Sequence, residues 1–151
     1  MNSDILEKQK QLEPWLTVIG LLTVMWTPIE RRIDECVFFL SSKDNAKKPL
    51  SLNRKLDFIE RNLPQSMECN PSIKEIVNLT KETAQIRDVC VHGVIESYDE
   101  NLMVIGKVQG KSNDFHMEMF TYDQARLFSA GNNLNVLHEI WEKLSNDLST
   151  S

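Results

Sequence analysis

The sequence predicts a mainly α protein: an up-and-down four-helix bundle with a β-hairpin inserted before the last helix. Three observations predict it. Apolar residues recur at intervals of three and four along most of the chain, which is typical of amphipathic helices. Capping residues, prolines and a glycine divide these stretches into separate helices. Two short, partly alternating apolar runs at 102–105 and 115–120, separated by the polar segment 110–114, predict the hairpin.

Length and composition predict one domain over residues 1–151. Hydrophobic residues make up 41% and charged residues 26%, which is ordinary for a globular chain and unlike a disordered one. A chain of this length can bury most of its apolar surface around one core. Residues 1–9 and 146–151 are expected to fray at the two ends.

The first helix is expected over about residues 10 to 42. Its apolar stripe consists of Leu12, Trp15, Leu16, Ile19, Leu22, Trp26, Ile29, Ile33, Cys36, Val37 and Leu40. Pro28 removes a backbone donor and crowds the carbonyl four residues earlier, so a kink or local break is expected near residues 24–27. The stripe continues past the proline, which favours one helix. Trp15, Trp26 and Trp141 lie on the stripes and are predicted core residues.

The same segment bears on localisation. The apolar run from Trp15 to Trp26 is short for a bilayer span, and charged residues follow it closely. The N-terminus lacks the basic stretch, apolar region and cleavage site of a secretory signal. The sequence therefore predicts a soluble cytoplasmic protein that does not act at a membrane.

The second helix is expected after a polar, lysine-rich loop at residues 42–49. Ser51 is placed to cap it, and Pro64 is placed to stop it. Its apolar face would consist of Leu52, Leu56, Ile59 and Leu63.

The third and last helices have start and stop signals of their own. Asn70 followed by Pro71 predicts the start of the third helix, and Gly93 is expected to end it as a left-handed C-cap. Thr121 with Gln124 three residues later predicts a capping box at the start of the last helix.

Charge and cysteine content restrict the function. The net charge of −5, from 17 Lys and Arg against 22 Asp and Glu, disfavours broad coating of nucleic acid. Cys36, Cys69 and Cys90 lie far apart and have no metal-ligand spacing, so no structural zinc and no cofactor are expected. Cys36 and Cys90 have apolar neighbours and are expected to be reduced core residues.

The segment Arg87-Asp88-Val89-Cys90-Val91-His92-Gly93 is the strongest functional signal. Asp88 and His92 are four residues apart on a helix, so the carboxylate can accept a hydrogen bond from the imidazole and fix its tautomer. Arg87 lies about 140° around the helix from His92 at 3.6 residues per turn. Two copies of the helix could combine an arginine that binds phosphate with a histidine that moves a proton. Alternatively, Arg87 and Asp88 are surface partners and His92 interacts with the helix dipole.

The run from Arg87 to His92 resembles the signature of HEPN domains: an arginine, a polar residue, a few variable residues and a histidine. Gly93 also suits that pattern. The resemblance covers about residues 12 to 148, because the helix with Trp26 and Glu30, the short second helix and the hairpin before the last helix also resemble bacterial members of this family.

The resemblance implies a homodimer in which the motifs of two protomers meet in a shared cleft. Active members cleave RNA without a metal, by attack of the 2′-hydroxyl on the adjacent phosphorus to leave a 2′,3′-cyclic phosphate. In this chain Arg87 would then stabilise the phosphorane charge, His92 would act as general base or acid, and Asp88 would orient the pair.

The function implied by the resemblance is a metal-independent endoribonuclease of a toxin–antitoxin or phage-defence system. Its partners would be RNA and an antitoxin or another protein. The alternative is a non-catalytic helical module that binds a partner protein or a nucleotide through the same cleft. A third reading is a stress-related scaffold that assembles through its long first helix.

Overall fold

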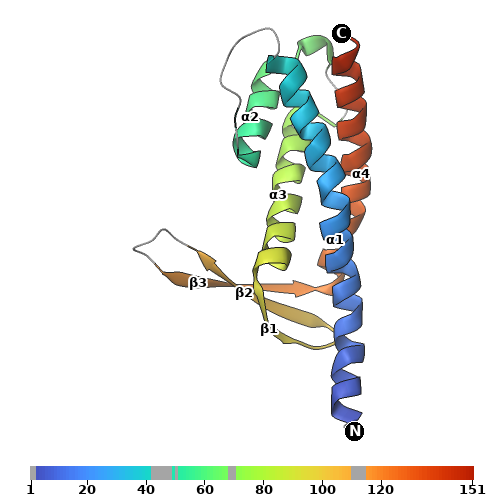
Figure 1. The fold of residues 1–151 in the computed structure, drawn as a ribbon, viewed down its shortest axis with the longest axis vertical. Coiled ribbons are helices and arrows are strands. Elements are labelled where there is room, and N and C mark those ends of the chain that lie inside the picture. Colours follow the sequence, from blue (N-terminus) through green and yellow to red (C-terminus); the bar gives the residue numbers. More distant parts are fainter. Residues whose placement is uncertain (1–2, 42–48, 50, 68–70, 110–114) are drawn as a thin grey trace. The chain divides into compact units, whose positions relative to one another are not determined.

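The computed structural model describes residues 3–41, 49, 51–67, 71–109 and 115–151 (Figure 1). Its elements are α1 (Ser3–Ser41), α2 (Leu52–Asn62), a 3-10 turn (Gln65–Met67), α3 (Ile73–His92), β1 (Val94–Tyr98), β2 (Leu102–Gln109), β3 (His116–Asp123) and α4 (Gln124–Ser149). The predicted mainly α fold, with four helices and an antiparallel sheet before the last of them, is confirmed. The sheet has three strands, because β1 precedes the predicted hairpin.

The chain divides into two compact units, each built from separate stretches of sequence. The first unit consists of residues 1–24 and 84–132, and the second of residues 25–83 and 133–151. Helices α1, α3 and α4 contribute residues to both units.

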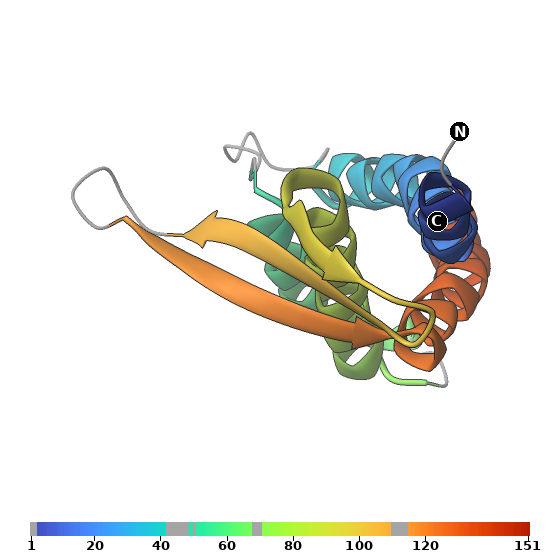
Figure 2. The same ribbon diagram turned by 90° about the horizontal axis from the view of Figure 1, so that it is seen from below.

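The first unit contains the sheet, whose strands lie side by side in the order β1-β2-β3 (Figure 2). Strands β2 and β3 pair without interruption from Leu102 opposite Asp123 to Gln109 opposite His116. The pairing of β1 with β2 contains a bulge between Ile95 and Ser97, which interrupts the alternation of side chains along β1.

The core of the first unit joins the sheet to the N-terminal part of α1. The Trp15 indole Nε1 donates a hydrogen bond to the backbone oxygen of Asp99 at 2.8 Å. The buried residues of this unit are Trp15, Val18, Leu22, Ile86, Val89, Cys90, Met103, Ile105, Tyr122, Leu127 and Ala130. This hydrogen bond satisfies the only polar atom of a large buried ring.

In the second unit, the C-terminal part of α1 packs against α4 (Figure 1). Ser145 donates a hydrogen bond to Glu35 Oε2 at 2.6 Å, and Arg32 lies 3.4 Å from Glu142. The core of this unit consists of Trp26, Ile29, Ile33, Cys36, Val37, Leu56, Ile59, Ile76, Val77, Leu134, Leu137, Trp141, Leu144 and Leu148. The three tryptophans are 1–3% exposed or fully buried, as predicted.

Helices α1 and α4 are longer than predicted. Helix α1 begins at Ser3 and is continuous through Pro28, without the expected break. Buried Trp26 and Ile29 flank this proline, so core packing holds the helix on both sides of the missing donor. Helix α4 extends to Ser149, past residue 146, from which the sequence predicted fraying.

The helix caps explain the remaining boundaries. Ser51 caps α2 by accepting from the Arg54 backbone N–H, and α2 ends before Leu63, both as predicted. The expected start of α3 at Pro71 is wrong, because Ser72 and Glu75 form a capping box and the helix begins at Ile73. The predicted loop at 42–49, apart from Pro49, lies outside the described residues, as does Asn70.

Helix α4 has a cap other than the predicted box. Thr121 belongs to β3, and Asp123 Oδ1 accepts a hydrogen bond from the Arg126 backbone N–H at 2.7 Å. Asp123 is therefore the N-cap of α4 and also the last paired residue of β3, opposite Leu102.

Helix α1 is also long and apolar enough, by length and composition alone, to cross a membrane. Of its most apolar window of 18 residues, 28% is buried inside the structure. A core helix has the same composition, so the predicted cytoplasmic location stays a prediction.

Candidate functional site

The predicted site lies where α3 turns directly into the sheet. Gly93 separates the last residue of α3 from the first of β1, and its N–H donates to the Val89 oxygen at 2.8 Å. A Cβ on Gly93 would lie 2.2 Å from Ile105 Cγ2 and 2.6 Å from the Val89 oxygen. The backbone at Gly93 is outside the left-handed region, so the predicted left-handed cap is wrong. Close approach of β2 requires the glycine instead.

Asp88 is held by a lysine from the sheet. Lys107 Nζ in β2 binds Asp88 Oδ2 in α3, and the two side chains are 21% and 42% exposed. The alternation of β2 places Lys107 on the same face as the fully buried Met103 and Ile105. The inward-facing side chains of this apolar strand therefore include a cation, Lys107, which pairs with the Asp88 carboxylate of α3.

Lys107 cannot be identified from the spacing of the motif. The lysine is 19 residues from Asp88 in the chain, so no local spacing connects the two. A signal was present, because Lys107 is a charged residue at an inward position of an otherwise apolar strand. Such a residue requires a partner of opposite charge or a ligand.

His92 does not make the predicted hydrogen bond with Asp88. Its Nε2 lies 3.8 Å from Asp88 Oδ1, which is beyond hydrogen-bonding range. The imidazole is 59% exposed at the end of α3. The carboxylate is engaged by Lys107 through its other oxygen, so Asp88 faces both groups but orients only the lysine.

Arg87 has an unsatisfied donor. Its Nε is buried and has no hydrogen-bond partner among the described residues. A buried guanidinium N–H without an acceptor is unfavourable, and most such groups in proteins are paired. The Arg87 side chain is therefore only partly satisfied by the contacts of the described residues.

The structure brings together Asp88, His92 and Lys107. Arg87 is adjacent in sequence, and within the part of the chain that the structure describes it makes no ion pair or hydrogen bond with His92.

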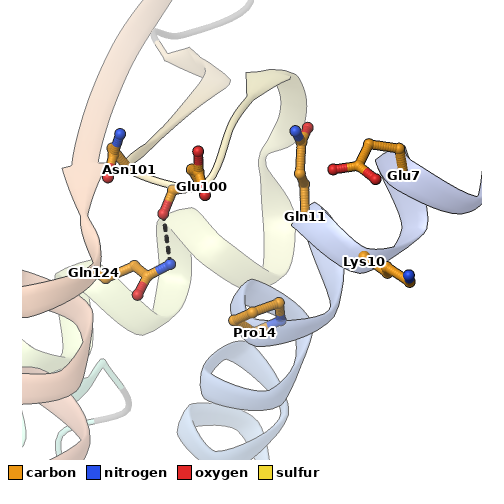
Figure 3. A pocket seen from close by; sticks show the side chains of 7 residues that line it. All are labelled: Glu7, Lys10, Gln11, Pro14, Glu100, Asn101 and Gln124. Atoms are coloured by element: carbon orange, nitrogen blue, oxygen red, sulfur yellow. Dashed lines mark hydrogen bonds between the residues drawn. The ribbon is translucent and has the colours of Figure 1, made fainter. Parts of the chain in front are cut away.

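A polar pocket lies elsewhere in the first unit (Figure 3). It has a volume of about 390 Å³ and is lined by Glu7, Lys10, Gln11, Pro14, Glu100, Asn101 and Gln124. Gln124 donates a hydrogen bond to the Glu100 oxygen at 2.6 Å on one side of it. The predicted site residues do not line this pocket.

Among the described residues, the cysteines and possible metal ligands add no second site. Burial raises the pKa of Cys36 to about 12 and that of Cys90 to about 11, so both thiols are neutral core groups, as predicted. Within the described ranges, no group of three or more His, Cys, Asp or Glu side chains is placed to hold a metal ion. Cys69 lies outside those ranges.

Comparison with known proteins does not assign a family. No family model matches the chain, and neither the curated proteins nor the solved structures contain a match to it.

Proposed function

We propose that this chain is a HEPN-like, homodimeric endoribonuclease that acts without a metal. The observation that carries the proposal is the buried Arg87 Nε, which lacks an acceptor among the described residues. Guanidinium groups bind phosphate strongly because the hydrogen bond is charge-assisted, so Arg87 is the proposed phosphate-binding residue. The exposed imidazole of His92 lies five residues later on the same helix, about 140° around its axis from Arg87.

The proposed reaction is transfer of the phosphoryl group within the RNA. His92 removes the proton from the 2′-hydroxyl, and the 2′-oxygen forms a bond to the adjacent phosphorus. The bond from phosphorus to the 5′-oxygen breaks, and His92 of the partner subunit donates a proton to that leaving oxygen. The products are a 2′,3′-cyclic phosphate and a 5′-hydroxyl.

Arg87 stabilises the additional negative charge on the phosphorane in this reaction. Asp88 holds Lys107 at the helix end, where the lysine adds a second cation beside the motif. The resemblance of the motif to HEPN domains supports a dimer in which two such sites share a cleft. It also supports a role in a toxin–antitoxin or phage-defence system of the cytoplasm.

The test is incubation of the purified protein with total RNA in EDTA, followed by analysis of the fragment ends. Wild-type protein is expected to leave 2′,3′-cyclic phosphates. His92→Ala and Arg87→Ala are each expected to reduce cleavage by about 10² to 10⁴-fold, the usual contribution of a general acid or base. His138→Ala is the matched control, because His138 is also a partly exposed histidine on a helix. Cleavage that survives His92→Ala, or fragments that end in 3′-hydroxyls, would overturn the mechanism.

A second candidate is a non-catalytic module that binds a nucleotide or RNA through the same residues. The 3.8 Å separation of His92 from Asp88 favours it, because no hydrogen bond fixes the imidazole for proton transfer. This candidate predicts no cleavage by any variant and binding of labelled RNA that Arg87→Ala weakens. His92→Ala would leave that binding within about twofold, since Arg87 supplies the charge-assisted contact to phosphate.

A further inference from the structure

The two faces of the sheet differ in what covers them. Residues directly opposite each other in an antiparallel pair share a face. Met103 with Tyr122, and Ile105 with Phe120, lie on the inner face, and Lys107 on that face binds Asp88 of α3. The alternate residues of β2 and β3 therefore form the outer face.

The outer face is apolar although it is exposed. Its large apolar side chains are Val94 (64% exposed), Leu102 (46%), Val108 (52%), Met117 (46%) and Met119 (56%). An antiparallel sheet with one solvated face usually carries polar residues on that face. A contiguous exposed apolar surface on a folded protein is typical of an interaction site.

Side chains from both outer strands meet over Gly106 in the middle of β2. The position of a Cβ on Gly106 lies 2.9 Å from Met117 Sδ, 3.2 Å from Met119 Sδ and 2.8 Å from Glu96 Oε1. Only a glycine leaves room for these three flexible side chains to lie flat on the strand. Methionine is unbranched and polarisable, so such a surface adapts its shape to an apolar partner.

The charges on the outer face decide which partner fits. Its described strand residues include the carboxylates of Glu96 and Asp123 but no lysine or arginine. A second copy of this face would place carboxylates against carboxylates, and an anionic membrane would repel them. A cationic amphipathic helix presents an apolar stripe bordered by Lys or Arg, which complements both the methionines and the acids.

We propose that the outer face of the sheet, formed by Val94, Leu102, Val108, Met117 and Met119 with Glu96 and Asp123, binds a cationic amphipathic helix of another protein. The apolar stripe of that helix packs on the two methionines, and its basic side chains pair with Glu96 and Asp123. None of these residues belongs to the proposed Arg87, Asp88 and His92 site, so the inference does not depend on ribonuclease activity.

The probe is a dye-labelled model peptide of Leu and Lys, about 18 residues or five helical turns long, arranged with one apolar face. Binding is measured by fluorescence anisotropy at low and physiological salt. A peptide of the same pattern with Glu in place of Lys, and a scrambled Leu/Lys peptide, are the ligand controls. Only the patterned cationic peptide is expected to bind, and its affinity is expected to fall with salt.

Variants of the two outer-face methionines test the location of the site. The double variant Met117→Ser and Met119→Ser is expected to weaken binding by at least about tenfold, because central apolar contacts dominate interface affinity. Leu16→Ser with Leu21→Ser is the matched control, because these residues are 50% and 47% exposed on α1. If the double serine variant does not fold, Val108→Lys tests the same face by adding a repulsive charge.

Glu96→Gln tests the charge complementarity, with Glu82→Gln, an exposed acid of α3, as its control. Of these two variants, only Glu96→Gln is expected to weaken peptide binding, by about threefold or more at low salt. The proposal is overturned if the wild type does not bind at about 1 mM peptide, or if the methionine and control variants bind alike. It is also overturned if the methionine variant dissociates a dimer in sedimentation, because the face would then bind a second copy.

Discussion

The ammonium group of Lys107 in β2 is bound to the carboxylate of Asp88 in α3, so one ion pair joins the sheet to the helix that carries the motif. Both side chains are partly exposed, and pairs of this kind contribute modestly to stability. In a double-mutant cycle with Asp88→Asn and Lys107→Met, the coupling energy is expected to be about 0.5–1 kcal/mol. Urea unfolding of the four proteins measures it. A coupling energy indistinguishable from zero would mean that the pair does not hold in solution.

A second prediction concerns the glycine between α3 and β1. Gly93→Ala is expected to lower the free energy of unfolding by about 1–3 kcal/mol, because a Cβ cannot be accommodated against Ile105 without displacing β2. Gly131→Ala is the control, since nothing lies within 4 Å of its Cβ position in α4. That control is expected to stabilise the protein by about 0.5–1 kcal/mol, because alanine favours a helix interior. Equal changes in the free energy of unfolding for Gly93→Ala and Gly131→Ala would contradict the close approach of β2 to Gly93.

A third prediction concerns the buried indole of Trp141. Its Nε1 donates to Thr80 Oγ1 at 3.1 Å, and both residues are fully buried. Thr80→Val keeps the shape of the side chain but removes the acceptor. It is expected to lower the free energy of unfolding by about 1–3 kcal/mol, because the buried indole N–H is left unpaired. Thr83→Val is the control, because the Thr83 hydroxyl bonds only to the Leu79 oxygen of its own helix in the described structure. The stability is measured by thermal or urea unfolding. A larger loss of stability for Thr83→Val than for Thr80→Val would refute the contribution of the hydrogen bond between Trp141 and Thr80.

A fourth prediction concerns pH. The hydrogen bond from Ser145 lowers the pKa of Glu35 below its ordinary value of 4.5; burial opposes this, and Arg32 adds to the lowering. A carboxyl group with a depressed pKa stabilises the fold fully above its unfolded pKa, and this contribution is lost as pH falls through the folded pKa. Acidification below about pH 4.5 should therefore lower the free energy of unfolding of the wild type more than that of the Ser145→Ala variant.

The measurement is urea unfolding across that pH range, together with the NMR titration of the Glu35 carboxyl. Ser145→Ala is expected to raise the pKa of Glu35 toward 4.5. Ser149→Ala is the control, because the Ser149 hydroxyl donates only to the Asn146 oxygen among the described contacts. An unchanged titration of Glu35 in Ser145→Ala would show that the hydrogen bond is not responsible.

The helices could be predicted because their stripes are local. Spacing of three and four identified Trp15, Trp26 and Trp141 as core residues, and all three are buried. Strand β1 could not be found in this way, because its bulge breaks the alternation of the sequence Val-Ile-Glu-Ser-Tyr. The turn after it did carry a signal: Asp99 Oδ1 accepts from the N–H groups of Asn101 and Leu102 at 2.7 and 2.8 Å. Asp in this position is typical of a tight turn.

The sequence predicted where the motif residues lie on their helix, but not which residues they contact. The motif spacing placed Asp88 and His92 on one helix end, which is where they lie. It also predicted a hydrogen bond between them, whereas the carboxylate is bound by Lys107 from a strand that follows in the chain. The position of a residue on a helix follows from sequence spacing, but its partner depends on which strand packs against that helix.

Neither compact unit is continuous in sequence, which has a consequence for synthesis on the ribosome. Trp15 bonds to Asp99, 84 residues later, and Trp141 bonds to Thr80, 61 residues earlier. The apolar stripe of α1 therefore emerges long before the segments that cover it, and contacts between distant residues form slowly. Until α4 has been translated, the nascent chain carries an uncovered tryptophan-bearing helix of the kind that chaperones bind.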